Sequence, residues 1–416
     1  MIPRCRPAAL LLALLIGAAG TGAGQDKEKD KKDDPKKKVD AKLEEMKKDD
    51  PKDKDKDAAK KSVEDVAAAK AAAIQKHAKE TLAEEVSFKS VDGVKLSGLF
   101  YKALDAAKPV VLMLHDYKAD PAAGVWDDTA RLCLAKGFNV LRFDFRGHGK
   151  STEVIPGEFW VRRENSSLIN GGTAANVATK TAIKHADFRP AYFPMLVQDI
   201  AAARNYLDQL NDSGTVNTST VYLLGAGDAA GLGFLYMASE WSRERIKPNV
   251  GVPAQYVSAR RALFPSSEPA GPDIGGAIWL GPTRNQSIPP AGLKQWCLNA
   301  ATVELRSQTR MLFVYGDKDT KGAAFSKFLF SDVLVIDRRT TSDGTVLSKP
   351  EFVSYLRGIK DSAATSTKLL GNALGTEKLI GDFLKDIDKD RSAKTRKSRE
   401  WDKPLWINVS DYGLCN

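Results

Sequence analysis

Short apolar runs alternate with helical patterns from residue 84 onward, and this alternation limits the fold more than any other feature. Residues 109–114 form an unbroken apolar run, the kind that a parallel sheet buries on both faces. Residues 125–136 have the spacing of an amphipathic helix and end at Gly137, where a left-handed helix cap favours glycine. Strands and helices that alternate in this way predict an α/β domain with a mostly parallel sheet.

The remaining elements follow from the same pattern. Asp92-Gly93 separates two strand-like runs, residues 86–91 and 94–101, and predicts a hairpin. Further strands are expected at residues 139–145, 221–224, 276–280 and 311–315, and helices at residues 194–210, 350–358 and 378–387. We expect one domain over residues 84–387 with a flanking layer of helices. Three insertions are expected in it, a cap-like one at about residues 152–189 and surface ones at about residues 241–272 and 335–366.

Residues 1–24 have the pattern of a secretory signal peptide. Arg4 and Arg6 precede an apolar run at residues 8–19, and small residues follow that run. The run is too short for a membrane span, which needs roughly 20 residues. We expect cleavage near residues 23–25, a secreted or periplasmic mature protein, and no membrane span.

The two ends of the mature chain differ in composition from the domain. Residues 25–61 are almost wholly Lys, Asp and Glu, so they cannot bury enough apolar surface to fold and are predicted to be a disordered linker. Residues 62–83 are alanine-rich and predict one helix. The tail, residues 388–416, begins with charged residues and ends with dense apolar ones, so we expect it to dock on the domain or on a partner.

Charge and cysteine content exclude several classes of protein. The net charge of +10 does not predict nucleic-acid binding, because Lys and Arg are interleaved with Asp and Glu. The mature chain keeps three scattered cysteines, Cys133, Cys297 and Cys415, which form neither a disulfide framework nor a zinc-binding pair. We therefore expect no cofactor and no structural metal.

Four short motifs follow predicted strands in a fixed order. They are Leu114-His115-Asp116, Arg146-Gly147-His148-Gly149-Lys150-Ser151, the segment from Leu224 to Gly231, and Tyr315-Gly316-Asp317-Lys318-Asp319. Together they resemble the landmarks of the α/β-hydrolase superfamily, and the resemblance covers roughly residues 84–387. It implies an α/β-hydrolase fold in which His115, Asp116 and Tyr117 form the oxyanion region.

The position of the nucleophile departs from the motif of this superfamily. Hydrolysis on this fold needs a nucleophile on a sharp strand-to-helix turn, G-x-S-x-G. Counting from the strand at residues 221–224 places Gly227 at that position, and glycine has no side chain to attack a substrate. A shift of one residue offers Asp228 instead, which resembles the aspartate nucleophile of dehalogenases and epoxide hydrolases.

The histidine of the catalytic triad is missing as well. The superfamily carries it after the last strand, which we place at residues 368–377, and no histidine occurs anywhere after His185. His77 is expected on the surface, and His115 and His148 are expected to be structural. His185, in the cap-like insertion, is the one residue that could act as a relocated base. The triad acid corresponds to Asp319, with Asp317 beside it.

We therefore expect a protein that acts in binding or assembly rather than in hydrolysis. Asp116, Asp228 and Asp319 could present three acids to a pocket at the ends of the strands, suited to a small-molecule or cation ligand. The alternative is an atypical esterase, dehalogenase or epoxide-hydrolase-like enzyme that uses Asp228 with His185. A third hypothesis is a surface scaffold, in which the linker is a spacer and the tail is the contact. The sequence identifies no partner.

Overall fold

The structure is a computed structural model, and it describes residues 51–117, 124–173, 175, 179–245, 268–298, 303–334, 354–371, 373–389, 391, 394–399, 406–412 and 414. The expected signal peptide and residues 25–50 of the expected linker lie outside these residues. The chain divides into two compact units, residues 1–66 and 67–416. Among the described residues the first unit consists of the beginning of helix α2 (Pro51–Glu80).

Helix α2 begins earlier than the sequence predicts. Residues 51–61 were expected to be disordered, and this expectation is wrong because they form the first turns of the helix. Proline is well suited to the first turn of a helix, and the lysines and alanines that follow Pro51 have high helix propensity. The charged composition therefore does not prevent helix formation here.

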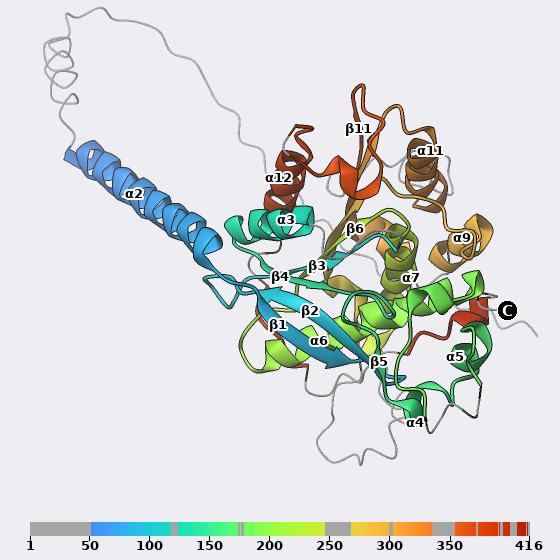
Figure 1. The fold of residues 1–416 in the computed structure, drawn as a ribbon. Coiled ribbons are helices and arrows are strands. Elements are labelled where there is room, and N and C mark those ends of the chain that lie inside the picture. The colour runs from blue at the N-terminus through green and yellow to red at the C-terminus, as the bar shows by residue number, and fades with distance from the viewer. Residues whose placement is uncertain are drawn as a thin grey trace, which may run out of the picture. The chain divides into compact units, whose positions relative to one another are not determined.

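The main sheet has nine strands among the described residues, and most neighbours in it are parallel (Figure 1). Its order is β1-β2-β4-β3-β6-β9-β10-β11, with the short β5 paired to β2. The strands are β1 (Glu84–Lys89), β2 (Val94–Tyr101), β3 (Val110–Leu114), β4 (Asn139–Phe143), β5 (Glu153–Val154), β6 (Val221–Ala226), β9 (Ile274–Leu280), β10 (Arg310–Gly316) and β11 (Tyr355–Ile359). Strand β2 is antiparallel to β1 and β4, which confirms the expected hairpin, and all pairs from β4 to β11 are parallel.

Helices and short helical turns connect the strands. They are α3 (Gly124–Ala135), α4 (Pro156–Phe159), α5 (Arg163–Leu168), η3 (His185–Asp187), η4 (Pro190–Leu196), α6 (Val197–Asp212), α7 (Ala229–Ser242), η6 (Gly271–Asp273), α9 (Pro290–Leu298), α10 (Val303–Gln308), α11 (Thr320–Phe328), η8 (Leu329–Val333), η9 (Ser366–Leu369), α12 (Thr376–Lys389) and η10 (Val409–Tyr412). A second, two-stranded sheet pairs β7 (Glu244–Arg245) with β8 (Glu268–Pro269). No helix in the described part of the chain is both long enough and apolar enough to cross a membrane.

The central strands bury both faces, as the unbroken apolar runs predict. Along β3, Val110, Leu112 and Leu114 join one hydrophobic cluster, and Val111 and Met113 join the other. Helices α6 and α7 supply the first cluster, whereas α3 and α12 supply the second, so the sheet lies between two helical layers (Figure 1). This layering leaves the loops at the ends of the strands free to build a site.

The helix expected at residues 350–358 is wrong. Residues 355–359 form strand β11, which pairs in parallel with β10, and residues 350–353 lie outside the described residues. The segment is short and contains Gly358, and pairing with the edge of the sheet overrides its weak helical pattern. The last strand, β11, therefore ends before residues 368–377, the segment to which the sequence analysis assigned the last strand.

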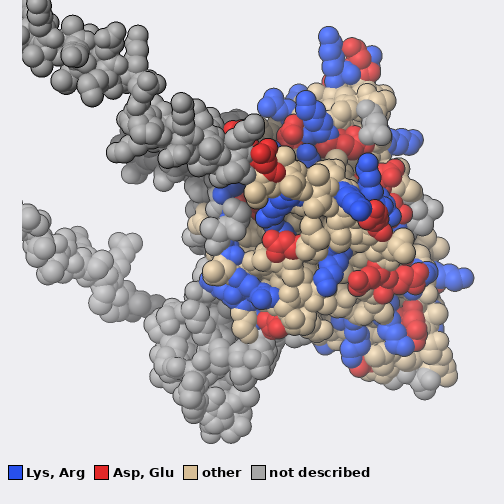
Figure 2. Space-filling view, turned by 90° about the vertical axis from the view of Figure 1, so that its left-hand side faces the viewer, with Lys and Arg blue, Asp and Glu red and all other residues tan. Residues whose placement is uncertain are grey.

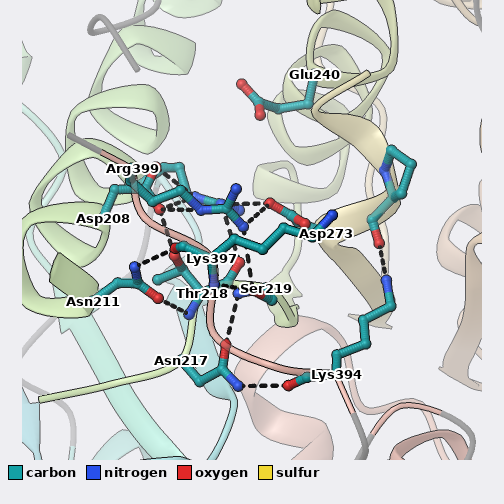
Figure 3. A network of polar contacts seen from close by, with 12 residues as sticks. Asp208, Asn211, Asn217, Thr218, Ser219, Glu240, Asp273, Lys394, Lys397 and Arg399 are labelled. Carbon is teal, nitrogen blue, oxygen red and sulfur yellow. Dashed lines mark hydrogen bonds and ion pairs between the residues drawn. The ribbon is translucent and has the colours of Figure 1, made fainter. Parts of the chain in front are cut away.

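The C-terminal tail docks on the domain, and part of it does so through buried charge (Figure 3). Arg399 donates to Asp273, whose carboxylate also accepts from Arg204, and all three side chains are buried. Side chains of the domain also bond to the backbone of the tail, since Asn211 donates to the carbonyl oxygen of Lys397.

Farther along the tail, Ile407 and Val409 are buried in the first hydrophobic cluster. The backbone of Ile407 exchanges two hydrogen bonds with the side chain of Gln198. One of the two expected outcomes, docking on the domain itself, is therefore confirmed for these residues.

Charges of both signs share the surface. On the face drawn in Figure 2, Lys and Arg side chains are interspersed with Asp and Glu side chains. Exposed ion pairs in the structure include Lys89 with Glu158 and Lys150 with Glu85. Such exposed pairs contribute little to stability, about 0–1 kcal/mol each.

Candidate functional site

The candidate site lies at the carboxyl ends of the parallel strands, where open α/β sheets bind ligands. Because β3, β6, β9, β10 and β11 are parallel, the loops that follow them emerge from one edge of the sheet. Side chains from the loops after β3, β6, β9 and β11 meet there.

The turn from β6 into α7 has the form of a nucleophile elbow. Gly227 connects the two elements with a φ of +59°, a left-handed conformation that glycine adopts without steric cost. Its N–H donates to Leu280 at the end of β9, and its carbonyl oxygen accepts from the N–H of Thr283. Of the two residues that the sequence analysis placed at the nucleophile position, Gly227 rather than Asp228 lies at the apex of the turn.

The space above Gly227 is filled by another residue. A Cβ atom at Gly227 would lie 2.0 Å from Oδ2 of Asp116 and 2.9 Å from Oγ of Ser366. Asp116 follows β3 and is half-buried, and Ser366 follows β11 and is buried. No side chain fits at position 227 while Asp116 keeps this conformation.

Asp116 and Ser366 are bonded directly. The Ser366 hydroxyl donates to Oδ2 of Asp116 over 2.5 Å, which joins residues 250 positions apart in the sequence. Ser366 has a φ of +49°, which strains a residue other than glycine. Ser366 was missed by sequence reasoning, since neither its backbone conformation nor this long-range contact leaves a sequence signal.

Asp228 lies next to Asp116 at the start of α7 and is 4% exposed. One carboxylate oxygen accepts from the N–H of Tyr117 and the other from the side-chain amide of Asn285, both over 3.1 Å. Burial, followed by the charge of Asp116 and a hydrogen bond between the two carboxyl groups, raises the pKa of Asp228 to about 6. Asp116 and Asp228 thus form an acid pair, and Asn285 is a second residue that the sequence did not reveal.

The other predicted acids stabilise backbone turns. Asp319 caps helix α11, with Oδ1 accepting from the N–H of Gly322. Asp317 accepts from the N–H groups of Asp361 and Ser362 and so fixes the loop after β11. Among the described residues no three acidic, histidine or cysteine side chains form a group that could hold a metal ion. The three-acid cluster expected from the sequence is therefore reduced to the pair Asp116 and Asp228.

His115 has a structural environment. Its Nε2 accepts from the N–H of Phe145, and its Nδ1 lies 2.9 Å from the carbonyl oxygen of Asp116. The first contact requires Nδ1 to carry the proton, so both ring nitrogens are engaged in fixing the loop that contains Asp116. This arrangement agrees with the structural role expected for His115.

His148 and His185 lie together beside Tyr117. Their rings stack with centroids 4.3 Å apart, and the ring of Tyr117 contacts both. Burial lowers the pKa of His148, although its ring nitrogens face the carbonyl oxygens of Arg146 and Tyr117.

The ring Nδ1 of His185 lies 3.3 Å from the carbonyl oxygen of Gly147. Within the part of the chain that the structure describes, no hydrogen bond joins His185 to Asp228. The role of His185 as a relocated base stays a prediction.

The order of the strands decides the fold. Along the main path the fourth strand lies between the second and the third, and the fifth, β6, leads directly into the elbow at Gly227. The protein has an α/β-hydrolase fold. In this fold the triad histidine follows the last strand, and here the loop after β11 carries Ser366 and no histidine.

No protein-family model and no curated protein matches the chain. Among solved structures, it is similar to an esterase from Pyrococcus furiosus, with a TM-score of 0.41 and 12% identity over 74% of this chain and 91% of the esterase. It is also similar to a dienelactone hydrolase from Anabaena variabilis, with a TM-score of 0.41 and 13% identity over 75% and 98% of the two chains. Similarities of this size do not bear on activity, and the fold assignment rests on the strand order.

Proposed function

We propose that this α/β-hydrolase-fold protein acts by binding or assembly and does not hydrolyse substrates. One observation carries the proposal, namely that the Asp116 carboxylate occupies the space into which a nucleophile at position 227 would project. Covalent catalysis on this fold needs that side chain exposed at the apex of the turn. In this protein the apex holds Gly227, and its neighbours close over it.

One backbone donor of an oxyanion hole is also engaged by another group. In this fold one donor is the backbone N–H group in the loop after the third strand. The N–H of Tyr117, in that loop, donates to the carboxylate of Asp228. A carboxylate in this position would repel the negative charge that develops during acyl transfer. The engaged N–H group of Tyr117 and the nearby carboxylate of Asp228 both support a site that does not stabilise an oxyanion.

A base for water activation is the third missing part. Histidine is the residue suited to take a proton near neutral pH, and none occurs after His185. His185 is stacked on His148 and bonded toward Gly147, while both oxygens of Asp228 have other partners.

One observation favours the alternative, an atypical hydrolase that uses Asp228. Asp228 is buried beside the elbow with a pKa raised to about 6, and perturbed carboxyl groups of this kind occur at active sites. In that case Asp228 attacks the substrate or transfers a proton, and His185 must move toward it from the cap.

A screen of the purified mature protein distinguishes the two functions. Short-chain aryl esters, thioesters, epoxides and haloalkanes are tested with the wild type, with Asp228→Asn and with Asp382→Asn, which changes an exposed carboxylate on α12. Binding or assembly predicts no turnover by any of the three proteins. Turnover that Asp228→Asn abolishes and Asp382→Asn preserves would establish the alternative.

Export and a ligand at the acid pair are parts of the same proposal. The N-terminal pattern supports secretion or a periplasmic location, which fractionation of cells that express the full chain tests. The acid pair supports a small-molecule or cationic ligand. Calorimetric titration with polyamines, calcium and magnesium tests the cationic ligand, and the absence of heat in all three titrations would exclude a cation at the acid pair.

A further inference from the structure

A cavity of about 200 Å³ lies beside the end of β3. Its walls come from β1, β2, β3, β4, the first turn of α3 and the loop after β4, and they include Leu99, Met113 and Trp126. His115 contributes to the wall, but Asp116, Gly227 and Asp228 do not. The cavity is therefore distinct from the candidate site described above.

The cavity lies where helix α3 and the sheet do not fill the space between them. Leu99, Met113 and Trp126 belong to the hydrophobic cluster between the sheet and α3. Ser97 lies on the same face of β2 as Leu99, two residues away, and its small side chain leaves space in the wall of the cavity.

The floor of the cavity is apolar and fixed in place. Met113 and Trp126 are each no more than 2% exposed, so their positions are set by packing on all other sides. A dry apolar cavity of about 150 Å³ accommodates benzene. By that measure this cavity accommodates an aromatic or branched apolar group of slightly greater size.

The rim carries charges of both signs. Lys150 and Arg142 supply the positive charges, and Glu85 and Asp144 supply the negative ones. Lys150 pairs with Glu85, and their side chains are 68% and 72% exposed. Such an exposed pair is worth at most about 1 kcal/mol, so a ligand with its own charges can replace it.

We propose that this cavity binds a free amino acid with an apolar side chain. The apolar group enters the floor against Trp126 and Met113, the carboxylate faces Lys150, and the ammonium group faces Glu85. An apolar floor with a rim of both signs matches a zwitterion better than it matches a purely anionic, cationic or neutral compound.

Calorimetry with L-phenylalanine and its fragments tests the proposal. Dissociation constants of about 0.1–1 mM are expected for L-phenylalanine, from the efficiency of ligands with so few atoms. Glycine lacks the apolar group, phenethylamine the carboxylate, 3-phenylpropionate the ammonium group and benzene both charged groups. Each should bind at least about tenfold more weakly, which is about 1.4 kcal/mol. Absence of L-phenylalanine binding at 10 mM (roughly ten times the weakest expected dissociation constant), or equal binding of benzene, would overturn it.

Two variants locate the binding. Ser97→Leu adds a side chain that fills the cavity, and Ser87→Leu makes the same change at the position opposite Ser97 on β1, which is exposed and outside the cavity. Binding should be lost in Ser97→Leu and kept in Ser87→Leu, with circular dichroism confirming that both fold.

A third variant, Lys150→Ala, should weaken binding of L-phenylalanine and leave phenethylamine unchanged. Binding that survives in Ser97→Leu, or that is lost in Asp228→Asn, would place the ligand elsewhere. Because neither outcome depends on hydrolysis, this proposal and the proposed function can fail separately.

Discussion

The carboxylate of Asp116 lies where a side chain on Gly227 would begin. A Cβ atom at Gly227 would come within 2.4 Å of Cγ of Asp116 and closer still to Oδ2. These distances are shorter than any non-bonded contact between such atoms, so the two positions are coupled. The side chain at position 116 therefore limits which side chain position 227 can carry.

Gly227→Ala should destabilise the protein by about 2–4 kcal/mol, because it adds a clash and places alanine in a left-handed conformation. In an Asp116→Gly background the same change should cost only about 1–2 kcal/mol, the part due to backbone conformation. Urea denaturation of the wild type, the two single variants and the double variant measures the difference. Additive effects would show that Asp116 does not fill this space.

Asp228→Asn should stabilise the protein above pH 6. The pKa of Asp228 is raised from 3.8 to about 6, so the folded state binds this proton more tightly than the unfolded chain does. Stability therefore falls as the pH rises from about 4 to about 6, and an amide avoids that loss. We expect a gain of about 1–3 kcal/mol at pH 8 that disappears near pH 4. A gain that is independent of pH between 4 and 8 would contradict the raised pKa.

Ser366→Ala should be more harmful than Ser366→Gly. Both changes remove the hydroxyl that donates to Asp116, at a cost of about 1.5–3 kcal/mol. Glycine, however, relieves the strain of a φ of +49°, which is worth about 1 kcal/mol. Thermal denaturation of the two variants side by side should rank the glycine variant as the more stable, and the reverse order would show that position 366 is unstrained.

Arg399→Met should loosen the tail. The change removes the hydrogen bond from Arg399 to the buried carboxylate of Asp273, which Arg204 also contacts, and breaking a buried pair of this kind costs about 3 kcal/mol. Arg396→Met is a matched control because Arg396 is exposed three residues upstream, and we expect a change below about 0.5 kcal/mol. Limited proteolysis near the C-terminus should be faster for Arg399→Met alone, and equal rates would show that the tail is held by other contacts.

Local sequence patterns predicted the parts of the fold that they control. The apolar run of β3 and the glycine that ends α3 were both recognisable, since burial on two faces and a left-handed cap each restrict the residue type. Strand β11 was mistaken for a helix because a short edge strand is determined by pairing with β10 rather than by its own residues.

The candidate site was only partly predictable for a related reason. Gly227, Asp228 and Asp116 stand in motifs that follow strands, so their meeting at one edge could be inferred. Asn285 and Ser366 reach the same place from loops without a motif, and their contacts depend on tertiary structure alone. Asp319 was grouped with the acids, yet it caps α11, a common use of aspartate at a helix start.

Hydrolysis by the purified mature protein is the decisive measurement for the proposed absence of hydrolase activity. Release of product from aryl esters, thioesters, epoxides and haloalkanes is measured for the wild type and for Asp228→Asn at pH 5 to 8, which brackets the raised pKa of Asp228. A protein without hydrolase activity gives rates equal to the uncatalysed background for both proteins at every pH. Wild-type turnover that follows the ionisation of Asp228 and vanishes in Asp228→Asn would contradict it.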